Sequence, residues 1–147
     1  AISHVFKNAE RLGVSVTDYS LWGGSAGARM VGNIALQGTA GFGGDDLPKP
    51  RIVVIAYTGH AIFSENFPPT FITVSEDDSI VHVPTVDRRV ENMRNAEIEV
   101  EYRKYKNAGH GFGLGVVRMP KGGSNTPFSF GKTIYLNDVS MVDGECK

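Results

Sequence analysis

Residues 23–27 of the chain read GGSAG, and the apolar run YSLW at residues 19–22 stands immediately before them. After the pentapeptide, apolar residues recur at helical spacing as far as Ala35. Together these features predict a short buried strand, a tight turn at Ser25 and then a helix. We expect Gly23 and Gly27 to keep side chains out of a turn in which the strand and the helix nearly touch.

Ser25 is at the centre of a G-x-S-x-G pattern. Between a strand and a helix, this pattern is typical of a nucleophile elbow, a tight turn that lifts a serine hydroxyl above the sheet. A glycine-rich loop with an incidental serine is an equally open interpretation, because the chain holds 18 glycines. Partner residues for a catalytic serine elsewhere in the chain would favour the nucleophile elbow over the incidental serine.

The segments around the pentapeptide predict the fold class. Residues 52–56 and 71–74 are continuous apolar runs, which is typical of strands covered on both faces. Helical spacing marks residues 2–12 and a segment that starts at Pro84, and residues 98–103 alternate as in a strand with one solvated face. The order helix, strand, helix, strand, strand, helix, strand predicts an α/β fold, with a mainly parallel sheet flanked by helices.

Composition limits the classes of protein that are compatible with the chain. Its 147 residues, 41% hydrophobic and 21% charged, suit one globular domain. A net charge of −1 gives no electrostatic reason to expect nucleic acid or an anionic membrane as a partner. The only cysteine, Cys146, has no internal partner, which suits a reducing compartment such as the cytoplasm. A targeting segment upstream of Ala1 is still compatible with this sequence.

Three residues with catalytic potential follow expected strands. Ser25 follows the first strand, Asp78 the third and His110 the fourth, and parallel strands place their carboxyl ends at one edge of the sheet. A histidine can remove the proton of a serine near neutral pH, and a carboxylate can orient that histidine. The chain order Ser, Asp, His is the one found in α/β-hydrolases. These residues predict a catalytic triad.

Some assignments within this pattern have alternatives. Asp77 adjoins Asp78 in one acidic turn, and we prefer Asp78 because it stands three residues before Val81. We expect the other histidines, His4, His60 and His82, to be surface or packing residues. The histidines show no metal-ligand spacing, so we predict no metal and no cofactor. Trp22, in the strand before the elbow, has two interpretations, a platform for substrate or a core residue, and we expect it in the core.

Residues 2–115 resemble the C-terminal half of a bacterial α/β-hydrolase of the acetyl-xylan-esterase and feruloyl-esterase-like group. The resemblance is carried by YSLWGGSAG at residues 19–27, PPTF at 68–71, DDSIV at 77–81 and HGFGLG at 110–115. It implies hydrolysis of small carboxylic esters through an acyl-serine intermediate, with Ser25, Asp78 and His110 as the triad and the Ala26 backbone N–H in the oxyanion hole. In the G-x-x-D-x-x-V turn of the group, Ser75 replaces the usual glycine.

The chain also departs from this group. The group has several strands and a His-Gly-Gly oxyanion loop before the elbow, and residues 116–147 form an atypical tail without the expected terminal helix. We therefore expect residues 1–147 to be the C-terminal portion of one α/β-hydrolase domain. The open edge of the elbow strand predicts a homo-oligomer, a second chain or a longer parent that supplies the missing half. A catalytically impaired fragment and a serine peptidase of prolyl-oligopeptidase type are alternative functions.

Overall fold

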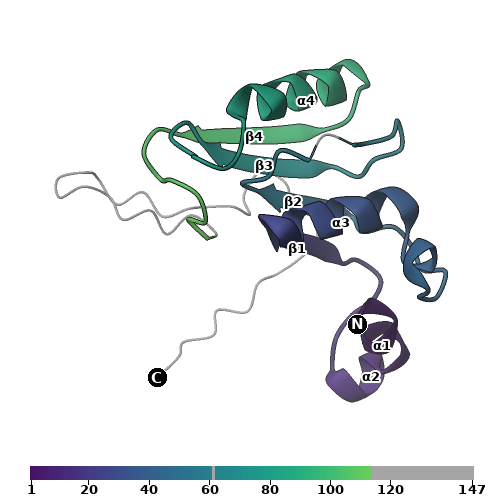
Figure 1. The fold of residues 1–147 in the computed structure, drawn as a ribbon. Coiled ribbons are helices and arrows are strands. Elements are labelled where there is room, and N and C mark those ends of the chain that lie inside the picture. Colours follow the sequence, from purple (N-terminus) through teal and green to yellow (C-terminus); the bar gives the residue numbers. More distant parts are fainter. Residues whose placement is uncertain (61, 114–147) are drawn as a thin grey trace, which may run out of the picture. The chain divides into compact units, whose positions relative to one another are not determined.

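The computed structural model describes residues 1–60 and 62–113. Predictions for residues 116–147, including Cys146, lie outside the described residues. Figure 1 shows the elements in chain order: α1 (Ile2–Lys7), α2 (Ala9–Leu12), β1 (Ser20–Gly24), α3 (Ala26–Gln37), the short 3₁₀ helix η1 (Ala40–Phe42), β2 (Ile52–Ala56), β3 (Thr70–Ser75), α4 (Val83–Asn95) and β4 (Val100–Tyr105).

The strands form one parallel sheet in the order β1-β2-β3-β4. Its register aligns Gly24 with Ala56, Ala56 with Thr73, and Thr73 with Arg103. The segments that follow these strands therefore emerge at one edge of the sheet. This arrangement confirms the predicted α/β class with a parallel sheet and flanking helices.

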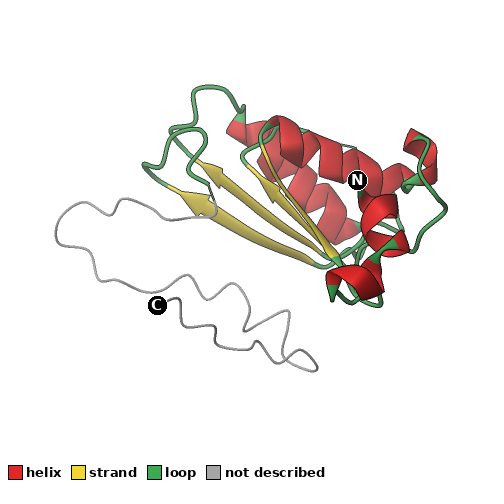
Figure 2. Cartoon of the chain, turned by 90° about the horizontal axis from the view of Figure 1, so that it is seen from below, coloured by secondary structure: helices red, strands yellow, loops and turns green. Residues whose placement is uncertain are grey.

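Both long helices cover the same face of the sheet, as Figure 2 shows. One apolar cluster joins the two central strands to the two helices, and its members include Val53, Ile55, Ile72, Val74, Ala28, Ala35, Val86, Val90 and Met93. Every residue of β2 and β3 is buried, as their apolar runs predict. Burial of one such apolar side chain contributes about 1.5–3 kcal/mol. Burial of these apolar runs therefore holds β2 and β3 in the centre of the sheet, and the segments that follow them lead into the site.

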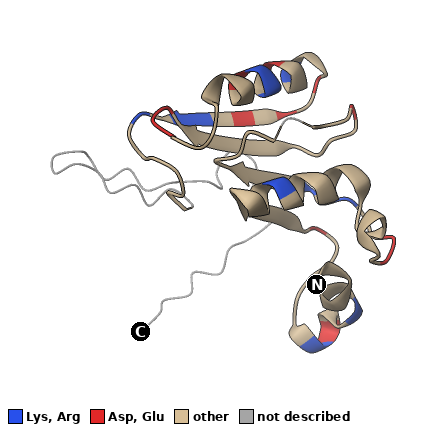
Figure 3. Ribbon diagram, in the orientation of Figure 1, with Lys and Arg blue, Asp and Glu red and all other residues tan. Residues whose placement is uncertain are grey.

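Charged residues gather on α4 and β4, whereas β1, β2 and β3 carry none (Figure 3). Asp87 of α4 accepts a hydrogen bond from the Tyr102 hydroxyl at 2.8 Å and pairs with the Lys104 ammonium at 2.8 Å. Because Tyr102 and Lys104 belong to β4, these contacts join the helix to the strand that precedes the His110 loop.

The N-terminal helical segment differs from its prediction as one helix. It is divided at Asn8, whose φ of −118° and ψ of 18° leave the helical region. The Asn8 side-chain amide donates to the His4 carbonyl oxygen at 2.8 Å, and such local bonds compete with a continuous helix. The sequence spacing of apolar residues is continuous across Asn8, so it did not reveal the break.

Strand β4 also begins later than expected. Ile98 is buried but precedes the strand, and Glu97 before it has a φ of 59°. This left-handed residue closes the turn after α4, so regular pairing starts only at Val100. Glu101 and Arg103 are half-buried and form an ion pair at 2.6 Å, so the face predicted as solvated is only partly exposed.

Candidate active site

Ser25 forms the turn between β1 and α3 by itself. Strand β1 ends at Gly24 and helix α3 begins at Ala26, which leaves Ser25 with a φ of 52° and a ψ of −119°. A non-glycine residue rarely adopts such a conformation, and it persists only where the surroundings impose it. The Ser25 N–H donates to the Ala56 carbonyl oxygen at 3.0 Å, which anchors the turn to β2.

The glycines of the turn differ in what they require. A Cβ atom at Gly23 would lie 2.3 Å from the Gly27 carbonyl oxygen, so the strand and the helix touch there. A Cβ at Gly24 would lie 2.2 Å from the Tyr57 hydroxyl. A Cβ at Gly27 would meet nothing within 4 Å in the described part of the chain. The steric prediction is confirmed for Gly23 and wrong for Gly27, because Gly27 contributes its backbone to the contact and its α-carbon faces open space.

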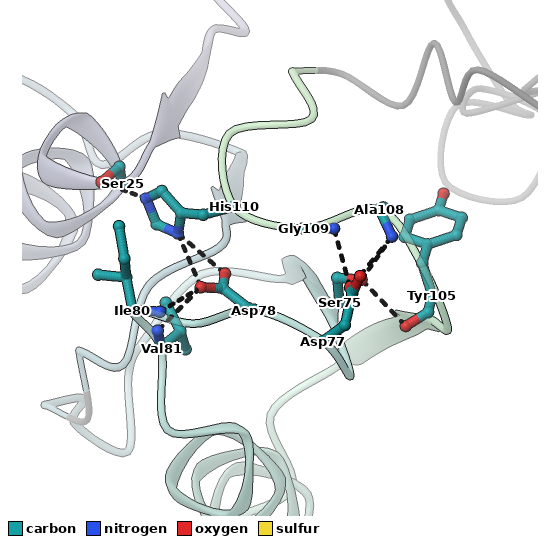
Figure 4. A network of polar contacts seen from close by, with 10 residues as sticks. All are labelled: Ser25, Ser75, Asp77, Asp78, Ile80, Val81, Tyr105, Ala108, Gly109 and His110. Atoms are coloured by element: carbon teal, nitrogen blue, oxygen red, sulfur yellow. Dashed lines mark hydrogen bonds and ion pairs between the residues drawn. The ribbon is translucent and has the colours of Figure 1, made fainter.

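The structure brings Ser25, His110 and Asp78 together (Figure 4). His110 Nε2 lies 2.9 Å from Ser25 Oγ, and His110 Nδ1 lies 2.9 Å from Asp78 Oδ2 and 3.0 Å from Asp78 Oδ1. The side chain of Asp78 is fully buried and that of His110 is 17% exposed. The three groups form a continuous line of hydrogen bonds, in which His110 Nε2 can take the proton of the serine hydroxyl while Asp78 orients the ring.

Asp78 is held from two sides. The backbone N–H groups of Ile80 and Val81 each donate to its Oδ1 atom at 2.9 Å, opposite the contact with His110. Burial alone would raise the pKa of Asp78, but these donors and His110 outweigh burial and hold the pKa below its ordinary value. The carboxylate is therefore ionised at neutral pH and accepts from His110 Nδ1.

Asp77 faces a different group. Its Oδ1 atom accepts from the Ser75 hydroxyl and from the backbone N–H groups of Ala108 at 3.2 Å and Gly109 at 2.8 Å. The bond from Ser75, followed by that from Gly109, lowers the pKa of Asp77. Of the two neighbouring aspartates, the structure places Asp78 against the imidazole and Asp77 against the backbone that precedes it.

Tyr57 is a site residue that the sequence analysis did not single out. Its ring packs edge-on against the His110 ring, with centroids 5.1 Å apart and an interplanar angle of 75°. It also contacts the Phe112 ring at 5.0 Å. A signal for Tyr57 lies in the sequence itself, because this residue directly follows the apolar run of β2 and therefore falls at the same edge of the sheet as Ser25.

Ala26 is the first residue of α3, so its backbone N–H is among those that a helix leaves without an intrahelical acceptor. Trp22 is 43% exposed, so the prediction that it lies in the core is wrong. Trp22 lies on β1, which is an end strand of the sheet formed by the described residues and pairs there with β2.

The other described histidines lie outside this group. His4 and His82 are exposed, and His82 Nδ1 lies 2.9 Å from the Thr85 hydroxyl at the start of α4. His60 is half-buried, and its carbonyl oxygen accepts from the buried Arg89 guanidinium at 2.5 Å. Desolvation lowers the pKa of Arg89 to about 10. His4 and His82 thus lie at the surface and His60 is partly packed, in line with what the sequence led us to expect.

Within residues 1–60 and 62–113, no group of three or more His, Cys, Asp or Glu side chains could hold a metal ion. In the same residues, no helix is long and apolar enough to cross a membrane.

Several solved structures resemble the described fold. An α/β hydrolase enzyme from a Medee basin deep-sea metagenome library has a TM-score of 0.59 and 22% identity, and the match covers 76% of this chain and 47% of that one. This chain has a partial α/β-hydrolase fold. An acetyl ester-xyloside bifunctional hydrolase from Caldicellulosiruptor lactoaceticus has a TM-score of 0.60 and 19% identity, with 77% and 55% of the two chains covered.

Esterase 2 from Thermogutta terrifontis gives a TM-score of 0.59 at 19% identity, with 76% of this chain and 53% of that chain covered. The chain thus spans about half the length of the solved structures that it matches. No family model and no curated protein matches its sequence. Identities this low show the shared fold, which is the partial α/β-hydrolase fold expected from the sequence.

Proposed function

We propose that this chain carries the triad of a serine carboxylester hydrolase, which acts through an acyl-serine intermediate. The observation that carries the proposal is the 2.9 Å contact between His110 Nε2 and the hydroxyl of Ser25, a residue held at a φ of 52°. A serine hydroxyl is a weak nucleophile until a neighbouring base removes its proton. Backbone strain at that same residue further supports a functional role, because strained residues cluster at active sites.

The geometry supports the following sequence of steps. Ser25 Oγ attacks the ester carbonyl carbon while His110 Nε2 takes the hydroxyl proton, and His110 then gives this proton to the departing alkoxide. Water attacks the acyl-serine, His110 accepts the proton of that water, and the acid leaves as the proton returns to Ser25. Asp78 holds the Nδ1–H tautomer and stabilises the imidazolium without taking the proton.

The Ala26 backbone N–H is our candidate for stabilising the oxyanion. It belongs to the residue after the nucleophile, at the N-terminus of α3, where the helix dipole favours negative charge. Loss of one oxyanion donor typically costs about 10²–10³ in turnover. A catalytically impaired hydrolase, in which the oxyanion hole is incomplete, is a second candidate function.

The names of the neighbours suggest a first substrate class. One is an acetyl ester hydrolase, and another structure of the Thermogutta terrifontis esterase is propionate-bound. We therefore propose esters of short carboxylic acids as substrates, with p-nitrophenyl acetate as the test compound.

The variant Ser25→Ala tests the proposal. It should lower the turnover of p-nitrophenyl acetate by on the order of 10⁴ or more, because the acyl-serine intermediate requires the Ser25 hydroxyl. Ser79→Ala, which changes an exposed serine in the turn after Asp78, is the matched control and should retain full activity. Equal activity in Ser25→Ala and in the unaltered chain would refute the assignment.

A fluorophosphonate probe separates the two candidate functions. A working hydrolase should gain the mass of the phosphonyl group on Ser25, and Ser25→Ala should gain none. A chain that remains unlabelled at Ser25, although folded, would support the impaired fragment.

A further inference from the structure

The loop that carries His110 has little rigidity of its own. Gly109, Gly111 and Gly113 surround the histidine and have φ values of 65°, 78° and 66°. Glycine loses more conformational freedom on folding than any other residue, so such a loop is costly to order. The imidazole must nevertheless stay between Ser25 and Asp78, because displacement by about 1 Å can reduce a rate 10²-fold. Contacts from outside the loop must hold it in place.

The turn after β3 supplies such contacts, as Figure 4 shows. Asp77 Oδ1 accepts from the N–H groups of Ala108 and Gly109, the two residues immediately before His110. The Ser75 hydroxyl oxygen also accepts from the Ala108 N–H at 2.9 Å, and it lies 3.3 Å from the Tyr105 carbonyl oxygen at the end of β4. Ser75 and Asp77 are themselves hydrogen-bonded to each other.

We propose that Asp77, together with Ser75, is a positioning clamp for His110: it binds the backbone of the histidine loop while Asp78 binds the imidazole. This inference rests on the proposed function. Two adjacent carboxylates would then fix one histidine at two points, the main chain before it and Nδ1 of its ring. A single rigid turn after β3 thereby sets both the position and the orientation of the imidazole.

The chemistry of the clamp suits this task. Ser75 is fully buried at the end of β3, so its hydroxyl is a rigidly held hydrogen-bond partner for the exposed Asp77. Hydrogen bonds from N–H groups to an ionised carboxylate are stronger than those between neutral groups. The lowered pKa of Asp77 keeps its carboxylate ionised into the acidic range. Its negative charge is therefore available to the loop amides at neutral pH.

The first test compares kinetic constants. Asp77→Ala should lower kcat for p-nitrophenyl acetate about ten- to a hundredfold and leave KM within about twofold, because a residue that only positions His110 affects the chemical step and not substrate binding. Asp77→Asn retains an Oδ1 acceptor and should recover most of the lost kcat. Glu76→Gln alters the exposed neighbouring carboxylate and should match the unaltered chain. An unchanged kcat in Asp77→Ala would overturn the proposal.

The second test does not depend on catalysis, so it separates failure of the clamp from failure of the proposed function. Hydrogen exchange of the Ala108 and Gly109 amides, and solvent exchange of the His110 Nδ1–H proton observed by NMR, should accelerate in Asp77→Ala but not in Glu76→Gln. Acceleration at the amides without any change at the ring proton would overturn the positioning role. If Asp77→Ala does not fold, Ser75→Ala provides the same comparison, since Ala108 loses its 2.9 Å acceptor.

Discussion

Asp77 and Asp78 show how neighbouring residues of one type acquire different roles. Both carboxylates have a lowered pKa, but different donors cause the shift. The Asp78 side chain is fully buried and faces a ring nitrogen, whereas Asp77 is exposed and faces main-chain amides. The sequence could favour Asp78 from its distance to Val81. It could not assign a role to Asp77, because that role depends on the path of a loop more than 30 residues away.

Asp78→Asn should keep the site nearly intact and lower kcat on the order of 10⁴, because an amide that donates to Nδ1 selects the wrong imidazole tautomer. Nε2 would then carry a proton and could not accept one from Ser25. Steady-state kinetics should show the loss in kcat with KM little changed. A decrease of less than about tenfold would contradict the role of Asp78 in orienting His110.

The same variant has a pH signature in stability. The folded-state pKa of Asp78 lies below its ordinary value of 3.8, so the ionised carboxylate stabilises the fold above that pH. This contribution is lost as the pH falls through the lowered folded-state value. Urea denaturation should therefore show the free energy of unfolding decreasing more steeply in the unaltered chain than in Asp78→Asn below about pH 4. Parallel decreases in both chains would indicate that other groups cause the acid sensitivity.

At the scale of elements, the elbow depends on backbone contact between β1 and α3. The strand, turn and helix could be predicted because apolar runs and helical spacing are local properties. Which glycine is sterically required could not be predicted, because crowding depends on where the helix crosses the strand. The break at Asn8 and the late start of β4 were missed for a related reason: each depends on one residue's backbone conformation and leaves the apolar pattern unchanged.

Gly23→Ala should destabilise the chain strongly, because its Cβ would lie 2.3 Å from the main-chain oxygen of Gly27 and a main-chain atom cannot rotate away. We expect a loss at or above the upper end of the roughly 1–3 kcal/mol typical of overpacking. Gly27→Ala is the matched control, since its Cβ meets nothing within 4 Å in the described residues. It should be neutral or stabilise α3 by up to about 1 kcal/mol.

Thermal melts of the two variants would measure this difference. Similar melting temperatures for Gly23→Ala and the unaltered chain would show that β1 and α3 can separate without cost. A severe loss in Gly27→Ala would show that this glycine has a role beyond the contacts described.

At the scale of the whole molecule, β1 is an end strand of the sheet formed by the described residues. The Tyr19 carbonyl oxygen accepts from Arg51 and the Ser25 N–H donates to Ala56, so the alternate groups between them point away from β2. A strand at the end of a sheet can pair with another chain. The expectation that a second chain, a further copy or a longer parent covers this edge remains a proposal.

We expect the isolated 147-residue chain to self-associate or to bind a hydrophobic dye. Sedimentation velocity over a hundredfold range of concentration, with dye fluorescence on the same samples, would measure both. A chain that stays monomeric and does not increase the fluorescence of the dye would contradict the proposal. A chain extended upstream to include further strands should lose both properties.

The exposed indole on β1 gives the molecule its own optical probe. Trp22 is the only tryptophan in the chain, and its Nε1–H donates to the Ser20 hydroxyl oxygen on the same strand at 2.7 Å. Selective excitation of this indole therefore reports on one strand, three residues before the candidate nucleophile, without any added label. Acylation of the serine and docking of another polypeptide along the strand could each be followed through its emission wavelength and quenching.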